Sequence, residues 1–306
     1  MKKTIKDLYN IEAKALIKYT DKVYKVKNND EEAYCLKYVD NLCSNTLIEK
    51  INTLNLNDCF EMPIKNCVRG NQSKYNNKLF YVSKWVEDDM IESKDLKIKH
   101  YLSQLGQLHK KTAYTLNVSS SFFNEITMLI KEDIEKSIQY FEKIISSFER
   151  KEYKSPFMWY FTEQYKNIID SLNKSNNYLE EFKKSTKEKL VIRQVIIHQN
   201  FSYDHVFIGK NKIIGNDKIK QASLVYDLKS LFDKIEFGSI DLSGIIDEYL
   251  NHITLEDYEL NWLFALLYIV EPLKIENSET KNIFNLTNAM FRYKSINELE
   301  NKLIKK

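Results

Sequence analysis

The spacing of apolar residues divides the chain into a strand-like part followed by a helical part. "VYKVKNNDEEAYCL" (23–36) alternates between apolar and polar residues, which predicts two strands joined by an Asn-Asn-Asp turn. "KLFYVSKWV" (78–86) predicts another strand, whereas the apolar residues of 42–56 recur at helical spacing. The first 86 residues therefore predict a small lobe that is rich in strands.

Helical spacing takes over after a polar connector near Glu87. The segment 95–112 places its leucines on one face, and 122–190 is almost entirely amphipathic helix. After the connector, strand texture appears only in "VIIHQNFSYDHVFIGKNKIIGNDK" (195–218), which predicts a buried strand, a polar loop and a hairpin. Helices resume at Ser223.

This order of elements predicts an α+β protein with two lobes. A small antiparallel-sheet lobe would span residues 1–86, and a large, mostly helical lobe would span 87–306 and contain the loop and hairpin at 195–218. The chain has only three Pro and six Gly, which favours long, unbroken helices. Two lobes of this kind predict a cleft between them in which a small molecule could bind.

Composition excludes several other classes of protein. Hydrophobic content of 43% excludes a disordered chain, and a net charge of +3 is too balanced to indicate nucleic acid or a membrane surface as a partner. The four Cys form no C-x-x-C pair, so they predict reduced thiols and not a zinc site. The first twenty residues lack the apolar core of a secretory signal, and no run approaches the roughly 20 apolar residues of a membrane span. These features predict a cytoplasmic protein.

Several segments together carry a resemblance to a known family. "YKVKNNDEEAYCLKYV", the strand ending in "SKWVEDD", the helix "LSQLGQLHK" and the loop "HQNFSYDHVFI" occur in an order and at spacings that resemble the spore-coat protein S family. That family is a bacterial branch of the aminoglycoside phosphotransferase and choline kinase group, which shares the protein-kinase-like fold. The resemblance covers roughly residues 20 to 235. It implies a location in the spore coat or mother-cell cytoplasm, with other spore coat proteins as partners.

The resemblance also implies which positions would carry phosphoryl transfer. In the related enzymes a loop carboxylate orients the attacking hydroxyl, an Asn and an Asp hold Mg²⁺, and a strand Lys holds the nucleotide phosphates. Here His198 matches the loop His that braces the backbone, Asn200 falls on the catalytic Asp, and His205 falls on the metal-binding Asn. Gly215 falls on the metal-binding Asp, and Lys37 matches the strand Lys.

Three of these residues, Asn200, His205 and Gly215, differ from the family pattern and remove the groups on which phosphoryl transfer depends. Asn200 cannot act as a carboxylate base, and the loss of a positioned base typically costs about 10²–10⁴ in rate. Gly215 has no side chain, and Mg²⁺ prefers oxygen ligands, which His205 does not supply. Asp204 or Asp217 could compensate by entering the metal site, which leaves a rewired site as the alternative.

The nucleotide-binding features are also reduced. No Gly occurs between Asn10 and Lys37, although close approach of backbone to phosphates usually needs Gly. Glu49 is the candidate to pair with Lys37, and a solvated helix Glu is an equally good interpretation of that residue.

Three functional hypotheses follow from the sequence. The first is a catalytically inactive kinase-like protein that serves as a binding or assembly component of the spore coat. The alternative is an active small-molecule phosphotransferase, which would use ATP and Mg²⁺ through a rewired metal site. The third is a regulatory pseudokinase that binds a nucleotide or sugar-like ligand without turnover. ATP and Mg²⁺ are expected as cofactors only if the site functions.

Overall fold

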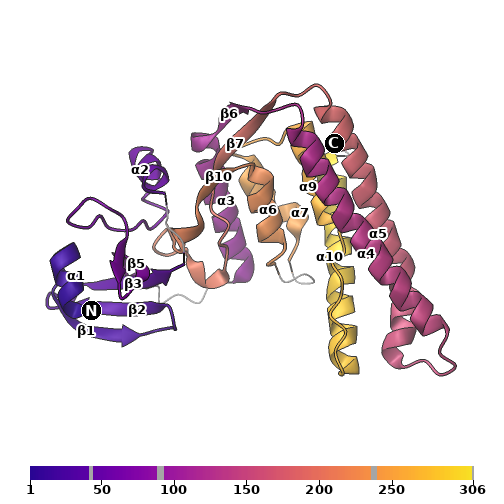
Figure 1. The fold of residues 1–306 in the computed structure, drawn as a ribbon, viewed down its shortest axis with the longest axis horizontal. Coiled ribbons are helices and arrows are strands. Elements are labelled where there is room, and N and C mark those ends of the chain that lie inside the picture. Colours follow the sequence, from indigo (N-terminus) through magenta and orange to yellow (C-terminus); the bar gives the residue numbers. More distant parts are fainter. Residues whose placement is uncertain (41–43, 88–92, 236–239, 305–306) are drawn as a thin grey trace. The chain divides into compact units, whose positions relative to one another are not determined.

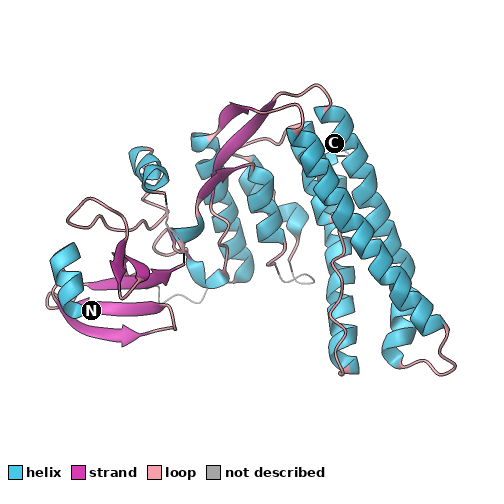
Figure 2. Ribbon diagram, in the orientation of Figure 1, coloured by secondary structure: helices cyan, strands magenta, loops and turns pink. Residues whose placement is uncertain are grey.

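A computed structural model describes residues 1–40, 44–87, 93–235 and 240–304, and these residues form two compact units (Figure 1). The first unit contains Met1–Ala113 and Val195–Ala222, and the second contains Tyr114–Gln194 and Ser223–Lys306. The α+β class predicted from the sequence is confirmed, because strands predominate near the amino terminus and helices predominate after it (Figure 2). The lobe boundary near Val86 stays a prediction.

Within the described residues of the first unit, five strands form an antiparallel sheet in the order β1-β2-β3-β5-β4. The predicted hairpin over 23–36 and the predicted strand over 78–86 are both confirmed. The first and fourth strands were not predicted. The five strands are β1 (Ala13–Lys18), β2 (Val23–Asn28), β3 (Ala33–Val39), β4 (Ser73–Tyr75) and β5 (Lys78–Lys84).

The two faces of this sheet have different surroundings. Helix α1 (Lys2–Tyr9) packs on one face, where its Ile5 contributes to a buried cluster with Val26, Leu36 and Phe80. Because side chains alternate along a strand, the residues between these point to the opposite face. Ladder pairing aligns the members of that opposite face across the strands, and we call it the lysine face: Ile17, Lys25, Cys35, Lys37, Tyr81 and Ser83.

The rest of the first unit supports the predicted loop and hairpin. Helix α2 (Asn45–Thr53) and helix α3 (Lys94–Thr112) each begin at a serine whose hydroxyl accepts from the backbone of the first turn. Two short strands, β8 (Val206–Phe207) and β9 (Lys212–Ile213), form the predicted hairpin. Strand β10 (Lys220–Ala222) pairs with the last residues of β7 (Val191–Ile197).

The second unit is built mainly from helices (Figure 1). The prediction of helix over 122–190 is confirmed as two long helices, and the predicted restart at Ser223 is confirmed because this residue is the N-cap of α6. The described helices are α4 (Phe122–Glu149), α5 (Pro156–Thr186), α6 (Leu224–Phe232), α7 (Leu242–Ile245), α8 (Asp247–Leu250), α9 (Asp257–Leu267) and α10 (Glu279–Ile304).

Strand structure extends beyond the 195–218 segment, so that part of the prediction is wrong. Strand β6 (Tyr114–Asn117) pairs with the first residues of β7, and β10 lies just past the hairpin. Both are short, at four and three residues, so neither shows a clear alternation in the sequence. Their extended conformation depends on pairing with β7.

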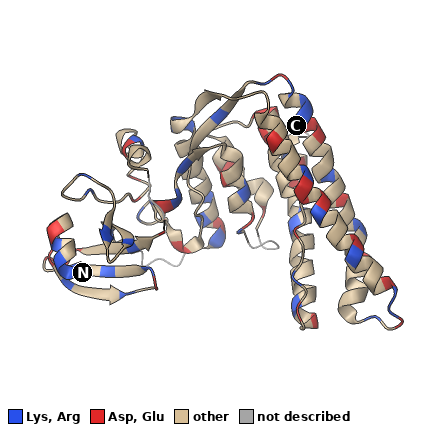
Figure 3. Cartoon of the chain, in the orientation of Figure 1, with Lys and Arg blue, Asp and Glu red and all other residues tan. Residues whose placement is uncertain are grey.

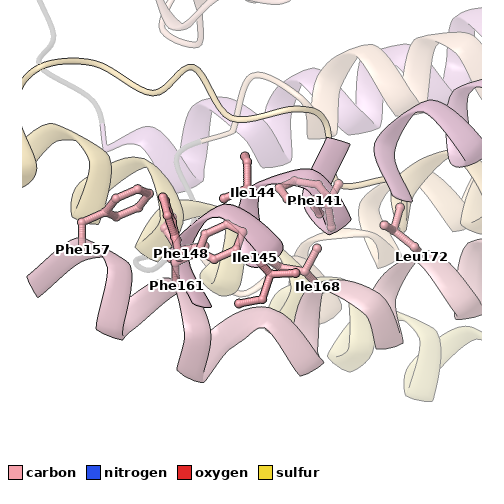
Figure 4. Close-up of a cluster of buried hydrophobic side chains, with 10 residues drawn as sticks. Phe141, Ile144, Ile145, Phe148, Phe157, Phe161, Ile168 and Leu172 are labelled. Carbon is pink, nitrogen blue, oxygen red and sulfur yellow. The ribbon is translucent and has the colours of Figure 1, made fainter. Parts of the chain in front are cut away.

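Aromatic and branched side chains of α4 and α5 form the core cluster of the second unit (Figure 4). Phe141 and Phe161 are fully buried, and Leu286 of α10 joins them. Charges of both signs are interspersed along the long helices (Figure 3). This division between apolar and charged positions is the amphipathic pattern from which the helices were predicted.

Two polar groups in the second unit are held by ion pairs. The side chain of Glu259 is fully buried and accepts from Arg193 Nε at 2.9 Å. Glu300 accepts from Lys174 Nζ at 2.6 Å and from the hydroxyls of Tyr178 and Tyr268. Burial raises the pKa of Glu300, but these three hydrogen bonds outweigh burial, so its pKa is lowered below the ordinary value.

Among the described residues, no helix is both long enough and apolar enough to cross a lipid bilayer.

Candidate functional site

The residues singled out in the sequence all lie in the first unit, but the structure brings only some of them together. Lys37 meets Asp217, and Asn200 meets both His205 and Gly215. The full set consists of Lys37, Glu49, His198, Asn200, Asp204, His205, Gly215 and Asp217.

An ion pair joins the sheet to the segment that follows the hairpin. Lys37 of β3 lies on the lysine face, and its Nζ donates to Asp217 Oδ1 at 2.6 Å. Both side chains are largely shielded, with 18% and 12% of their surface exposed, so the pair is screened less by solvent than a surface pair would be. The carboxylate thus neutralises the lysine that the resemblance matches to the nucleotide-binding strand Lys.

Cys35 lies on the same face, two residues before Lys37 on β3. Burial raises the pKa of the Cys35 thiol to about 11, and the nearby Lys37 ammonium opposes this shift only in part. The thiol is therefore protonated near neutral pH, which makes it a poor nucleophile.

The side chain of Asn200 forms a hydrogen bond with Gly215, the residue that the resemblance places at a metal-ligand position. Its side chain is buried, and Nδ2 donates to the backbone carbonyl of Gly215 at 2.7 Å. His205 contacts Asn200 through its backbone, with Nδ1 at 2.8 Å from the Asn200 carbonyl. Since a carbonyl can only accept, Nδ1 of His205 carries the proton in this contact. We call Asn200, His205 and Gly215 the loop triad.

Glycine is required at the third member of the loop triad for two reasons. Gly215 has φ +82°, in the left-handed region that disfavours side chains with a Cβ. A Cβ at this position would lie 2.7 Å from Asn200 Nδ2 and 3.0 Å from the ring of His205. The space that an Asp would need at position 215 is therefore taken by the other two residues.

His198 occupies the interior of the unit. It is fully buried, its Nδ1 lies 2.8 Å from the hydroxyl of Tyr101, and its ring packs against Phe60 and Tyr101. These contacts tie the loop to helix α3. Sequence reasoning missed Tyr101, because a tyrosine on the buried face of an amphipathic helix looks like an ordinary core residue.

Asn216 was also missed, although it positions the residue that pairs with Lys37. Its side chain is buried, and Nδ2 donates to the carbonyls of Glu61 at 2.8 Å and Ile213 at 3.2 Å. The backbone of the same region is held as well, since Glu61 N donates to the Ile213 carbonyl at 2.9 Å. These bonds fix the short helix η2 (Asn216–Lys218), and Asp217 is its middle residue.

Glu49 and Asp204 lie apart from these groups. Glu49, on α2, pairs with Lys65 at 2.9 Å, and both side chains are about half exposed. Lys37 instead pairs with Asp217. Asp204 is exposed in the short helix η1 (Tyr203–His205), where its backbone N–H donates to the hydroxyl of Ser202.

The donor set does not fit the Mg²⁺ ion that the resemblance implies. Mg²⁺ demands near-octahedral oxygen coordination, usually with carboxylates among the ligands. Gly215 supplies no side chain, His205 turns Nδ1 toward a carbonyl, and Asp217 is engaged by an ammonium group. Within the described ranges of the chain, no cluster of three or more His, Cys, Asp or Glu could hold a metal ion.

Comparison with known proteins identifies the fold. No family model and no curated protein matches the sequence. Among solved structures, an aminoglycoside phosphotransferase from Alicyclobacillus acidocaldarius is similar, with a TM-score of 0.68 and 10% identity over 96% of this chain and 93% of that one. The AMP-bound complex of a spectinomycin phosphotransferase gives a TM-score of 0.55 and 12% identity over 99% and 94% of the two chains.

These likenesses show that the chain has the kinase-like fold of the aminoglycoside phosphotransferases. The matches extend over nearly the whole length of both chains, so the fold resemblance is not confined to the sheet or to the helices. At 10–12% identity these likenesses show only the fold. Membership of the spore-coat protein S family therefore stays a proposal.

Proposed function

We propose that this chain is a catalytically inactive protein with a kinase-like fold, which serves as a binding or assembly component of the spore coat. The observation that carries the proposal is the hydrogen bond from Asn200 Nδ2 to the Gly215 carbonyl. It joins the position of the catalytic carboxylate to the position of a metal-binding carboxylate, and neither residue is a carboxylate.

The chemistry of Asn200 supports the loss of catalysis. An amide cannot take the proton of an attacking hydroxyl as a carboxylate can, and here its N–H group is directed at a backbone carbonyl. Losing a positioned base typically costs about 10²–10⁴ in rate. The effects of residues that act as a unit in catalysis are not additive, so loss of the base alone would remove most of the catalytic effect of the whole set.

Several large apolar side chains of the second unit are exposed. Met128 and Trp159 are 71% and 61% exposed on α4 and α5, and Phe284 is 64% exposed on α10. Single exposed apolar residues are common on protein surfaces, so these residues are available to a partner but do not by themselves indicate one. The location at the spore coat is supported by the motif resemblance over roughly residues 20 to 235.

A second candidate is an active phosphotransferase with a rewired site. The observation that favours it is the Asp217 carboxylate, which lies two residues past Gly215 and reaches Lys37 at 2.6 Å. A carboxylate is therefore present beside the lysine to which the resemblance assigns nucleotide phosphates. In this candidate, Asp217 would supply the metal ligand that Gly215 cannot.

Turnover assays on the purified chain separate the two candidates. The assays would measure ATP hydrolysis in the presence of Mg²⁺, and phosphoryl transfer to choline, sugar and aminoglycoside acceptors. They would compare the wild type with Lys37→Ala and Asp217→Ala. We expect all three to give the same background rate. Turnover by the wild type that disappears in both variants would establish the second candidate and overturn the first.

The coat assignment has its own test. Fractionation of sporulating cells of the source organism should recover the wild type and Asn200→Ala with the coat in equal amounts, because assembly does not use the catalytic position. Recovery of the wild type only from the mother-cell cytosol would contradict the coat role.

A further inference from the structure

A cavity lies at one end of the five-stranded sheet of the first unit. Its volume of about 550 Å³ is within the range of small-molecule sites in proteins. The described residues that line it come from the start of β2, the end of β3 and the turn between β4 and β5, and none of them belongs to the candidate site. Backbone bonding joins these walls, because Tyr38 N donates to the Lys22 carbonyl at 2.8 Å and Val39 pairs with Leu79.

Three half-buried tyrosines form the aromatic part of this cavity. Tyr24 and Tyr38 pair with Leu36 and Phe80 across the ladder, so they share the sheet face that carries α1, opposite the lysine face. Their ring centroids are 6.1 Å apart and their ring planes meet at 82°, so they form two walls nearly at right angles. Tyr75 of β4 supplies the third ring. Burial raises the pKa of Tyr38, and the phenol groups of Tyr24 and Tyr75 raise it further because all three lie near one another.

The charged groups that line the cavity balance one another. Asp21 and Asp40 supply two carboxylates, and Lys22 and Lys78 supply two ammonium groups. Asp40 pairs with Lys22 at 2.6 Å, and Asp21 pairs at 2.7 Å with Lys18. Tyrosine rings by themselves can hold a cation, but the two ammonium groups oppose one here. The lining therefore favours neither a cation nor an anion, and a neutral molecule fits it best.

The turn between β4 and β5 places two amide side chains at the cavity. Tyr75 pairs with Lys78 across it, so Asn76 and Asn77 form a two-residue turn. Their φ angles are 47° and 61°, as a type I′ turn requires, and this turn holds the two strands in register. Each amide offers both donors and an acceptor, and a hydroxyl group of a ligand can use both because it donates and accepts.

We propose that this cavity binds a neutral sugar, with one face of a pyranose ring against the tyrosines and its hydroxyl groups bonded to the amides of Asn76 and Asn77. A pyranose whose substituents are equatorial has only C–H groups on its faces and its polar groups around the rim. This division matches aromatic walls that lie beside a polar turn. The inference goes beyond the proposed function and does not depend on it, because the cavity shares no described residue with the candidate site.

Methyl β-glucoside is the probe, because it is uncharged and all its ring substituents are equatorial. Its dissociation constant would be measured by NMR titration of the purified chain, and choline and inorganic phosphate would serve as a cationic and an anionic probe. We expect saturable binding of the glucoside that shifts the side-chain amide signals of Asn76 and Asn77, and at least about 10-fold weaker binding of either charged probe. Tyr38→Leu removes one wall and should weaken glucoside binding about 10-fold, since an aromatic contact is worth up to about one factor of ten in affinity.

Tyr34 provides the matched control. It lies on the same face of β3 as Tyr38 and packs against the same buried cluster, but it does not line the cavity. Tyr34→Leu should therefore change glucoside affinity by less than about twofold. Equal weakening by Tyr34→Leu and Tyr38→Leu would show a general loss of stability and overturn the proposal.

Asn77→Gly tests the proposal even if Tyr38→Leu is unstable. An Asn-Gly pair suits a type I′ turn, so this variant is expected to fold, and the loss of one amide should weaken glucoside binding about fivefold. Absence of saturable glucoside binding by the wild type, an unchanged affinity in Asn77→Gly, or tighter binding of choline or phosphate would refute the proposal. Because neither turnover nor coat association is measured, failure here is distinct from failure of the proposed function.

Discussion

Substitution of Gly215 by alanine tests the packing of the loop triad most directly. The change adds a single methyl group at a residue with φ +82°, where its Cβ would lie 2.7 Å from Asn200 Nδ2. Real Cβ atoms do not approach other atoms so closely, so the Asn200 amide must move. Moving it breaks the hydrogen bond to the Gly215 carbonyl, which has an N···O distance of 2.7 Å.

The expected loss of stability can be worked from these contacts. Holding a non-glycine residue in the left-handed region costs about 1–2 kcal/mol. Leaving a buried hydrogen-bonding group without its partner costs about 1–3 kcal/mol. The reduced freedom of the unfolded chain returns about 0.4–1 kcal/mol, so the free energy of unfolding should fall by about 2–4 kcal/mol.

Urea denaturation measures this loss of stability. A double-mutant cycle over the wild type, Gly215→Ala, Asn200→Ala and the double variant shows how much of the loss comes from the contact between the two residues. In the Asn200→Ala background the amide is absent, so Gly215→Ala should cost only the backbone strain less the gain from the unfolded chain, about 1 kcal/mol. The cycle should therefore give a coupling energy of about 1–3 kcal/mol between the two positions.

A matched glycine provides the control. Gly70 has φ outside the left-handed region, and a Cβ there would lie 3.2 Å from Asn66 Nδ2. Gly70→Ala should change stability by less than about 1 kcal/mol. If the cycle between positions 200 and 215 is additive to within about 0.5 kcal/mol, the steric account of the loop triad is refuted.

Two further predictions concern the ion pairs of the second unit. Glu259→Gln removes the charge that neutralises Arg193 at a fully buried position and should lower the free energy of unfolding by about 3 kcal/mol, measured by urea denaturation. Glu132→Gln, which breaks an exposed pair with Lys136, should change it by less than about 1 kcal/mol, and equal losses would contradict this reasoning. Because the folded-state pKa of Glu300 is lowered, its stabilisation is complete above pH 4.5 and is lost as the pH falls through the folded-state pKa. Thermal denaturation from pH 6 to 3 should therefore show a smaller decline for Glu300→Gln than for the wild type, and an identical decline would exclude the linkage.

The sequence predicted the fold well where elements carry their own periodicity. The hairpin over 23–36 and the long helices α4 and α5 were predictable because alternation and helical spacing run through many residues. Strand β1 was not predicted, because "AKALIK" has no clear alternation and becomes a strand by pairing with β2. Helix α1 is only eight residues long and is held by packing on the sheet.

The candidate site was predictable in its residue types but not in its contacts. The family resemblance pointed to Lys37, His198 and Asn200, and their chemistry could be judged from side-chain type. The pairing of Lys37 with Asp217 joins residues 180 positions apart, which no local pattern can indicate. Asn216 was missed for a related reason, since its role depends on carbonyls that only the folded chain brings near it.

The loop triad also has a consequence for evolutionary history. If an ancestor carried carboxylates at positions 200 and 215, no single substitution leads back to it without a penalty. An aspartate at position 215 meets the Asn200 amide and the ring of His205. An aspartate at position 200 has no N–H to offer the Gly215 carbonyl, so two acceptors would face each other. Each single reversion therefore carries a structural penalty before any gain in catalysis, which opposes a stepwise return to carboxylates at both positions.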